Sequence, residues 1–176
     1  MDQIDINKLW QNFLDTVTNH YTDFSGRVGR AQFWYYVLVY VVVGIVVAIV
    51  GNLVALGGAF RGLYGLLLLL PNVGMTARRL QDTGKPGTWA WLLAVPVAVT
   101  VVFALFAIAT SLTLVLGLGV LLFTIWPLLS LISFAAIVVL IYFCAQPGTP
   151  GPNEYGAPPA PWTPGSPVKP TAPPVT

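Results

Sequence analysis

The chain is 176 residues long, 56% apolar and only 8% charged, with a net charge of +2. Soluble domains carry charge on about a quarter of their residues, so this composition excludes the ordinary soluble class. Between residues 31 and 153 the formal charges are few, namely Arg61, Arg78, Arg79, Asp82 and Lys85. The composition therefore predicts an all-α membrane protein that crosses the bilayer several times and has one concentrated charged loop.

Residues 1–23 are predicted to form an amphipathic helix. Apolar side chains recur there at steps of three and four residues, and polar side chains fall on the other face. Such a helix beside a membrane segment lies along the bilayer surface or packs against loops of its own chain, and the sequence leaves both open. Asp2 and Asp5 stand where a secretory signal would be basic, so we expect the first span to act as its own insertion signal.

Residues 24–145 are predicted to hold four transmembrane helices. A span needs about 20 apolar residues to cross the hydrocarbon core. The uncharged run at residues 31–60 has room for one span, the run at 62–77 for a short span, and the run at 86–153 for two. The expected spans cover residues 33–54, 60–77, 89–109 and 120–145.

Proline lies inside three of these expected spans. It lacks a backbone N–H and its ring clashes with the preceding turn, so it tends to kink or end a helix. Helix breaks are therefore predicted at Pro71, Asn72, Pro96 and Pro127.

Residues 146–176 differ in character from the rest of the chain. Eleven of these thirty-one residues are proline, and no apolar periodicity survives. This composition is typical of a disordered or polyproline-like tail. Spacings such as Pro158 to Pro161 to Pro164 match PxxP ligands, but such spacings arise by chance in a proline-rich segment.

The basic residues predict the orientation of the chain. Four spans put both termini on one side, which then holds seven of the eight basic residues, while Arg61 faces the other side. The positive-inside rule makes the basic side cytoplasmic. A three-span arrangement with a re-entrant last hairpin, which would place the tail outside, stays open.

Three short motifs fall on the side predicted to be cytoplasmic. They are Phe24-x-Gly26-Arg27-x-x-Arg30-x-x-Phe33-Trp34, then Arg78-Arg79-Leu80-Gln81-Asp82-Thr83-Gly84, and finally the segment from Pro147 to Gly156 with Asn153 and Tyr155. In this order, over residues 21–159, they resemble the domain-of-unknown-function 805 family. The resemblance implies a small bacterial inner-membrane protein whose activity is not established. The chain departs from the family pattern at Gln81, where the pattern has histidine, which argues against a proton or metal role there.

The basic residues of the first two motifs could serve structure or ligand binding. Arg27 and Arg30 are three residues apart and would share a helix face at the headgroup level. Asp82 can pair with either Arg78 or Arg79 and leave the other free. The plain alternatives are topology control and an ion pair that closes the loop at residues 78–87. The sharper hypothesis is a lipid-headgroup or phosphate site, because guanidinium groups suit phosphate, built from Arg27, Arg30, Arg78, Arg79 and Lys85.

The remaining motif residues are expected to be structural. In the third motif, they would fold the start of the tail back under the helices or form an ordinary turn. The structural set comprises Phe24, Gly26, Trp34, Leu80, Asp82, Thr83, Gly84, Asn153, Tyr155 and Gly156.

The sequence predicts no enzyme, no cofactor and no metal. It contains one histidine, His20, and one cysteine, Cys144, and only two acidic residues follow Asp23. No catalytic triad or metal-ligand set can be assembled from these groups.

We therefore expect a non-enzymatic membrane scaffold or accessory protein. It would contact anionic lipid, a partner membrane protein, or copies of itself at the small residues Gly44, Ala48, Gly58 and Gly62. No nucleic-acid partner is expected. The alternative is a small transporter or channel component with a site at the proline-broken helices, although no Asp, Glu, Lys or His lies inside an expected span.

Overall fold

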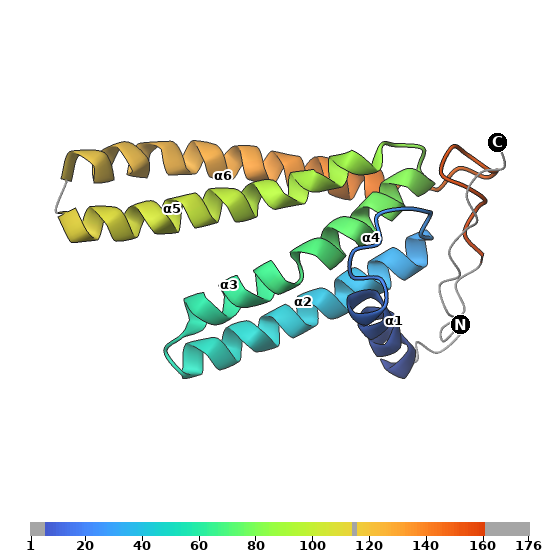
Figure 1. Ribbon diagram of the computed structural model, residues 1–176, viewed down its shortest axis with the longest axis horizontal. Coiled ribbons are helices and arrows are strands. Elements are labelled where there is room, and N and C mark those ends of the chain that lie inside the picture. Colours follow the sequence, from blue (N-terminus) through green and yellow to red (C-terminus); the bar gives the residue numbers. More distant parts are fainter. Residues whose placement is uncertain (1–5, 114–115, 161–176) are drawn as a thin grey trace.

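The computed structural model of the chain describes residues 6–113 and 116–160. Its regular elements are all helical, and within the described residues the only β-type pairing is an isolated bridge between Asn153 and Gly156. The all-α prediction is thus confirmed. In chain order (Figure 1) the elements are α1 (Ile6–Thr18), α2 (Arg30–Leu53), α3 (Gly57–Leu67), α4 (Leu69–Asp82), the 3₁₀ helix η1 (Gly87–Leu93), α5 (Ala94–Thr113) and α6 (Leu116–Ala145).

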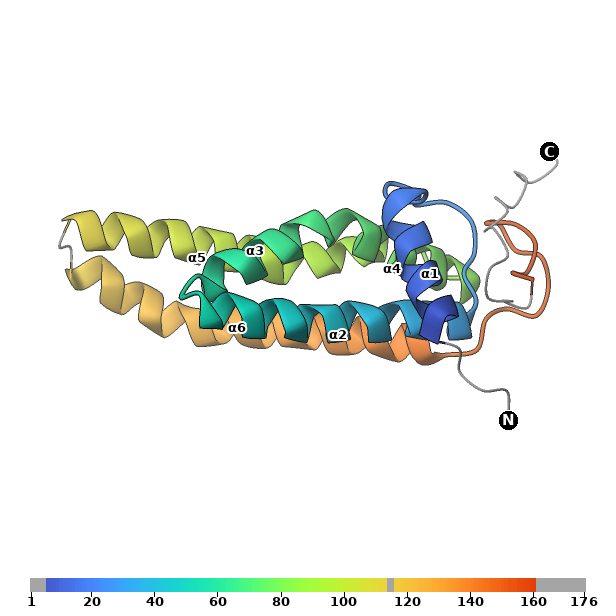
Figure 2. The ribbon, with the colours of Figure 1, turned by 90° about the horizontal axis from the view of Figure 1, so that it is seen from below.

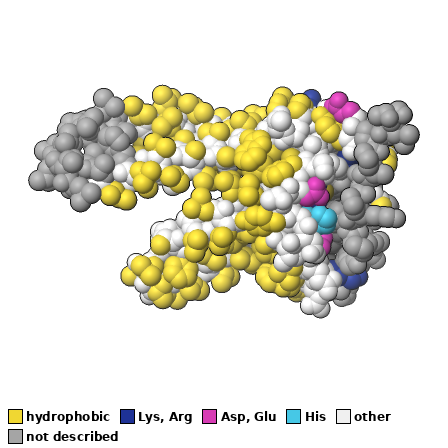
Figure 3. Space-filling model, viewed as in Figure 1, with side chains coloured by type: hydrophobic (Ala, Val, Ile, Leu, Met, Phe, Trp, Pro, Cys, Tyr) yellow, Lys and Arg dark blue, Asp and Glu magenta, His cyan; other side chains and the backbone are white. Residues whose placement is uncertain are grey.

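Two helical hairpins extend in the same direction from a shared end of the molecule (Figures 1 and 2). One hairpin pairs α2 with α3, and the other pairs α5 with α6. We call the shared end the head; it comprises α1, α4, η1 and the connecting residues 19–29, 83–86 and 146–160. Figure 3 shows charged side chains gathered at the head and apolar side chains covering the hairpins.

Three segments are long and apolar enough to cross a membrane: Arg30–Leu53, Gly87–Leu105 and Thr124–Ala145. They overlap the first, third and fourth predicted spans. The remaining predicted span, residues 60–77, is divided between α3 and α4. A fourth crossing therefore stays a prediction, whereas three membrane-capable helices are a feature of the structure.

The packed core lies in the head and in the adjoining ends of α2 and α6 rather than along the length of the hairpins. Most of α4 is buried there, from Val73 to Asp82, whereas many leucine, isoleucine and valine side chains of α2, α5 and α6 are exposed. This is the pattern expected when lipid covers the hairpins and protein covers the polar backbone ends. The buried apolar cluster contains Phe13, Val28, Phe33, Tyr36, Leu68, Val73, Met75, Ala77, Leu80, Ala90, Leu140 and Cys144.

The interruption between α3 and α4 lies at Leu68, just before the predicted break. Pro71 takes the third position of α4, where its missing N–H removes no helical hydrogen bond. A continuous helix would have left the carbonyl of Leu67, four residues earlier, without a donor. The Tyr21 hydroxyl donates a hydrogen bond to this carbonyl. A residue from the segment between α1 and α2 thus supplies the hydrogen-bond donor that this carbonyl lacks at the break.

The other two prolines behave differently from each other. Pro96 takes the third position of α5, directly after η1 ends at Leu93, so the backbone changes from 3₁₀ to α geometry at the predicted place. By contrast, α6 continues through Pro127. The break predicted there is wrong, because local adjustments and neighbouring groups let membrane helices tolerate the lost bond.

The end of α4 also differs from the sequence prediction. Residues 78–82, expected in a charged loop, form the last turn of this helix. Gly84 ends it with a φ of 73°, a conformation that glycine adopts without strain. The N–H of Lys85 then bonds the Leu80 carbonyl at 2.9 Å, and that of Gly84 bonds the Gln81 carbonyl at 3.2 Å. This pair of backbone hydrogen bonds is a Schellman motif.

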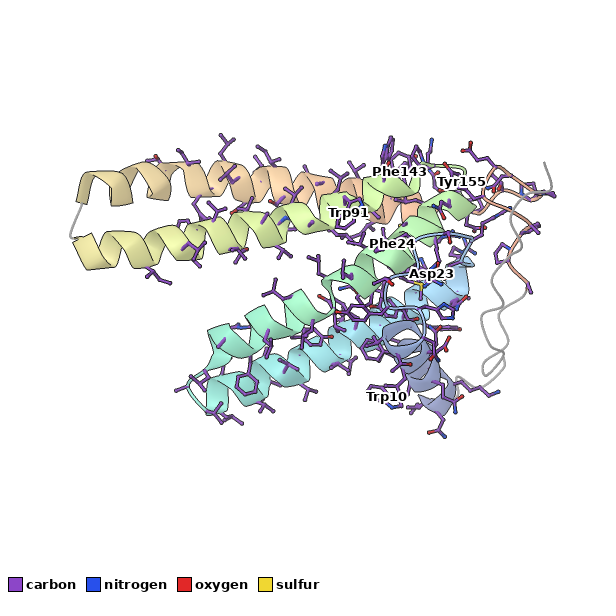
Figure 4. All side chains as sticks on the ribbon, viewed as in Figure 1. Trp10, Asp23, Phe24, Trp91, Phe143 and Tyr155 are labelled. Atoms are coloured by element: carbon purple, nitrogen blue, oxygen red, sulfur yellow. The ribbon has the colours of Figure 1, made fainter. Side chains whose placement is uncertain are left out.

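α1 lies across α2 at the head, as both views show (Figures 1 and 2). The Asn12 amide donates to the Gln32 carbonyl at 3.1 Å, and the Gln32 amide donates to Asn12 Oδ1 at 3.3 Å. The helix therefore packs on its own chain. Its other edge exposes an apolar stripe at four-residue steps, in which Trp10 points outward (Figure 4); the stripe comprises Ile6, Trp10 and Leu14.

The small residues of the first hairpin have two different environments. A Cβ on Gly44 would lie 3.3 Å from the Tyr64 ring, and the Tyr64 hydroxyl donates to the Tyr40 carbonyl at 2.6 Å. Gly44 thus allows α2 and α3 of the same chain to approach. A Cβ on Gly58 or Gly62 would meet nothing within 4 Å, so pairing with another copy at those positions stays a prediction.

Candidate functional site

The three sequence motifs meet at one buried carboxylate in the head. Arg27 lies just before α2, Arg79 and Asp82 lie in the last turn of α4, and residues 147–156 follow α6. The three charged residues are 5%, 0% and 3% exposed. We call these three residues the arginine–aspartate cluster and residues 147–156 the strap.

Asp82 divides its two oxygens between the two arginines. Its Oδ1 accepts a hydrogen bond from Arg27 Nε at 2.9 Å and lies 2.9 Å from Arg27 Nη2. Its Oδ2 accepts a hydrogen bond from Arg79 Nη1. Charge-assisted bonds of this kind are stronger than neutral ones. Two guanidinium groups face one carboxylate, which leaves one positive charge for other groups to offset.

Arg27 uses its remaining donors to hold the strap. Nη1 donates to the Gly151 carbonyl at 2.7 Å and to the Gly156 carbonyl at 3.3 Å, and Nη2 donates to the Thr149 carbonyl at 2.7 Å. The acceptors are backbone oxygens, so the bonds fix the path of the strap rather than its side chains. The first part of the predicted disordered tail is therefore structured, while residues 161–176 lie outside the described part.

Arg79 uses its remaining donors at the end of α6. Nε donates to the Cys144 carbonyl at 3.0 Å, and Nη2 donates to the Gln146 carbonyl. These oxygens lie at the negative end of the helix dipole, where a cation is favourable and helical carbonyls lack partners. Burial lowers the pKa of Arg79, and Asp82 opposes this shift; arginine pKa values are high enough for the group to stay charged.

The strap in turn caps the end of α4. The N–H and the hydroxyl of Thr149 donate to the Asp82 carbonyl at 2.8 and 3.2 Å, and the Asn153 amide donates to the Gln81 carbonyl at 2.9 Å. A Cβ on Gly148 would lie only 2.2 Å from Asp82 Oδ2. Glycine is therefore required where the strap passes over the carboxylate.

Arg78 turns toward Asp23, in the segment after α1, rather than toward Asp82. It is 2% exposed, its Nη1 lies 3.7 Å from Asp23 Oδ2, and its Nε has no partner among the described residues. Burial lowers the pKa of Arg78, and Asp23 opposes this shift. His20 lies 3.2 Å from Asp23 and 3.7 Å from Asp15. This group ties the segment after α1 to α4.

The predicted five-residue anion site is not formed as one exposed cluster. Arg27, Arg78 and Arg79 are buried and face groups of their own chain, because a buried charge needs a partner. Arg30 is exposed at the start of α2, and Lys85 is half-buried with its Nζ 5.1 Å from the Phe143 ring centroid. Only these two members of the set remain as candidate headgroup ligands.

The other motif residues pack around the cluster. Phe24 stacks on Trp91 with ring centroids 6.0 Å apart (Figure 4), and its carbonyl accepts a hydrogen bond from the Gln81 amide at 3.1 Å. Trp34 lies edge-on to Phe33 in the first turn and a half of α2. Gly26 has a φ of 95°, and Leu80 is fully buried. The Thr83 hydroxyl donates to the Leu80 carbonyl. In the strap, the Tyr155 N–H donates to the Asn153 side chain, and Gly156 pairs with Asn153 through their backbones.

Beside the cluster, a pocket of about 360 Å³ lies between the two hairpins. The described residues that line it include no Asp, Glu, Lys, Arg or His. Two of the predicted break residues, Asn72 and Pro96, line this pocket. Sequence analysis missed the roles of Tyr21 and Gly148, which depend on contacts with residues distant in the sequence. In addition, no three His, Cys, Asp or Glu side chains in residues 6–113 and 116–160 form a group that could hold a metal ion.

The fold and the cluster define a multi-pass helical membrane protein whose two hairpins are fastened together by buried charges. The chain belongs to the family described as "Protein of unknown function (DUF805)", which matches residues 21–157. The predicted membership and the assignment to an inner-membrane family are thus confirmed.

Curated relatives are similar over most of their length. The inner membrane protein YhaI of Escherichia coli (strain K12) is 28% identical over 142 residues, covering 80% of this chain and 89% of the relative. The inner membrane protein YhaH of the same strain is 26% identical over 148 residues, covering 81% and 92%. No solved structure matches the chain.

The first prediction concerns the carboxylate. Asp82→Asn removes the negative charge that two buried arginines share, so we expect the free energy of unfolding in detergent micelles to fall by about 3–5 kcal/mol. The control is Glu154→Gln, because Glu154 is an exposed acid in the strap. Equal stability of the two variants in denaturant titrations would contradict a role of Asp82 as the shared counterion.

The second prediction concerns the strap. Gly148→Ala places a methyl group on the Asp82 carboxylate, so we expect the strap to be displaced and cut several times faster by a protease in limited digestion. Gly151→Ala is the matched control, since its Cβ meets nothing within 4 Å. Identical digestion rates for the two variants would show that the strap does not pass over the carboxylate.

Proposed function

We propose that this protein is a non-enzymatic scaffold or accessory protein of the bacterial inner membrane that contacts anionic lipid at its cytoplasmic face. The supporting observation is the arginine–aspartate cluster. It commits Arg27, Arg79 and Asp82 to fastening the hairpins, and it leaves Lys85 in the head and Arg30 next to the head as candidates for contact with lipid.

The distribution of charge supports an orientation with the head in the cytoplasm. Arg61 lies near the tip of the first hairpin, where its Nε bonds the Gly57 carbonyl at 3.0 Å, whereas Arg27, Arg30 and Lys85 lie in or next to the head. The positive-inside rule favours the basic end as the cytoplasmic one. In this arrangement α3 and the start of α4 make the second of four crossings, and both termini lie in the cytoplasm.

The bonding of the charged groups supports a non-enzymatic role. A general acid, a general base or a nucleophile must reach its substrate. Both oxygens of Asp82 are occupied by arginine, and Cys144 is buried beside α4. These groups maintain the fold of the head, and the surface that remains suits contact with lipid or with another membrane protein.

A transporter or channel component is the second candidate. Both helix interruptions border the same pocket, because its lining includes Leu69 and Asn72 next to one and Leu93 and Pro96 next to the other. Discontinuous helices line the substrate sites of many transporters. Solute or ion flux into proteoliposomes above a protein-free control would favour this function over the scaffold.

The third prediction tests the orientation. We expect reporters fused after Lys85 and at the C-terminus to give cytoplasmic signals, and a reporter fused after Leu56 to give a periplasmic signal, because four crossings alternate the connecting segments. Green fluorescent protein and alkaline phosphatase fusions measure this. A Lys85 fusion and a C-terminal fusion on opposite faces would exclude the four-crossing arrangement.

The fourth prediction tests the lipid contact. Each basic residue near an anionic surface contributes about 1 kcal/mol, so the double variant Arg30→Gln/Lys85→Gln should bind phosphatidylglycerol roughly 30-fold more weakly. Native mass spectrometry of the delipidated protein with added lipid measures this. The control is Arg61→Gln, which removes a positive charge near the tip of the first hairpin. Unchanged binding in the double variant would refute headgroup contact at Arg30 and Lys85.

A further inference from the structure

The pocket between the hairpins has a polar end and an apolar end. The polar groups lie toward the head, where the Tyr36 hydroxyl donates to Asn72 Oδ1 at 2.8 Å and Thr76 also lines the wall. Away from the head, Val41 and Gly65 line the pocket. Figure 3 shows the molecule hollowed between the hairpins, with apolar side chains on both sides of the hollow.

The lining of the pocket covers about two turns of one helix from each hairpin. On α2 it extends from Phe33 to Val41, and on α6 from Ile137 to Cys144. At a rise of about 1.5 Å per residue, these stretches are roughly 12 and 10 Å long. When the hairpins cross the bilayer, both stretches lie alongside the lipid chains.

Arg30 is the first residue of α2, about one turn before the lining residues Phe33 and Trp34. It precedes Phe33 and Trp34 by three and four residues on α2, so these side chains share one helix face. Arg30 is exposed. A cation therefore lies at the head end of the helix face that lines the apolar pocket.

This order of groups matches a phospholipid. From the head outward come a cation, hydrogen-bonding side chains and apolar walls, as a phospholipid presents a phosphate, ester carbonyls and acyl chains. Because Asn72 Oδ1 accepts from Tyr36, the Asn72 N–H groups are available to donate. We propose that the pocket binds one acyl chain of an anionic phospholipid, with the phosphate at Arg30 and an ester carbonyl at Asn72.

The lining favours a lipid chain over a polar solute. A polar solute would leave its own groups without partners against the walls formed by Val37, Val41, Leu140 and Ile141. An acyl chain fills such a space with dispersion contacts. The inference deepens the proposed function and rests on its orientation, because it names the ligand of the same cytoplasmic face and places part of that ligand inside the protein.

Gly65→Leu provides a direct test. Gly65 lines the pocket, and a Cβ there would meet nothing within 4 Å, so the larger side chain of leucine has space at this wall of the pocket. Gly62→Leu is the matched control, since Gly62 lies on the same helix, also has open space, and does not line the pocket. We expect Gly65→Leu to bind dioleoyl phosphatidylglycerol at least tenfold more weakly and Gly62→Leu to bind it as the unmodified chain does.

Two further measurements distinguish binding of an acyl chain in the pocket from binding of the headgroup alone. Glycerol phosphate, which has the phosphate but no acyl chain, should compete only at concentrations far above that of the lipid, and competition at equal concentration would overturn the pocket. Wild-type binding by Gly65→Leu together with weak binding by Arg30→Gln/Lys85→Gln would overturn the pocket and leave the proposed function standing. Unchanged binding in both variants would overturn both. Equal weakening by Gly65→Leu and Gly62→Leu would place the lipid on the outer surface of α3 and also overturn the pocket.

Discussion

The structure of the head depends on one carboxylate that serves two arginines. Asp82 binds Arg27 through one oxygen and Arg79 through the other, and this joins the beginning of α2, the end of α4 and the end of α6. Burying charges is costly unless their partners are complete. Here the backbone carbonyls of the strap and of α6 accept the remaining guanidinium bonds, so the charges hold the elements together without facing lipid.

This fastening also explains the space between the hairpins. The hairpins are joined at the head and diverge away from it (Figure 1), so the pocket lies beside the cluster and Cys144 contributes to both. The charged groups and the apolar cavity are therefore parts of one arrangement.

The hydropathy of the sequence predicted the membrane-capable segments, because these depend only on local composition. The runs at residues 31–60 and 86–153 contain the three membrane-capable segments. It could not separate Pro71 from Pro127, because the outcome depends on whether a distant donor such as Tyr21 satisfies the freed carbonyl. Nor could it show that Arg27 and Arg79 are buried, since their acceptors are mostly backbone oxygens, which every residue has. The contact of Gly148 with Asp82 likewise arises only in the folded chain.

The bond from Tyr21 to Leu67 gives the peripheral helix α1 a further attachment, beside those of Asn12 and Asp23. Tyr21 follows α1 closely in sequence, and Leu67 is the last residue of α3. If α1 and the segment after it swung away from the protein, a main-chain oxygen at the bend would lose its donor in surroundings with little water, which costs several kcal/mol. The surface helix is thereby tethered to an interruption within the hairpins, whether or not lipid touches its outer edge.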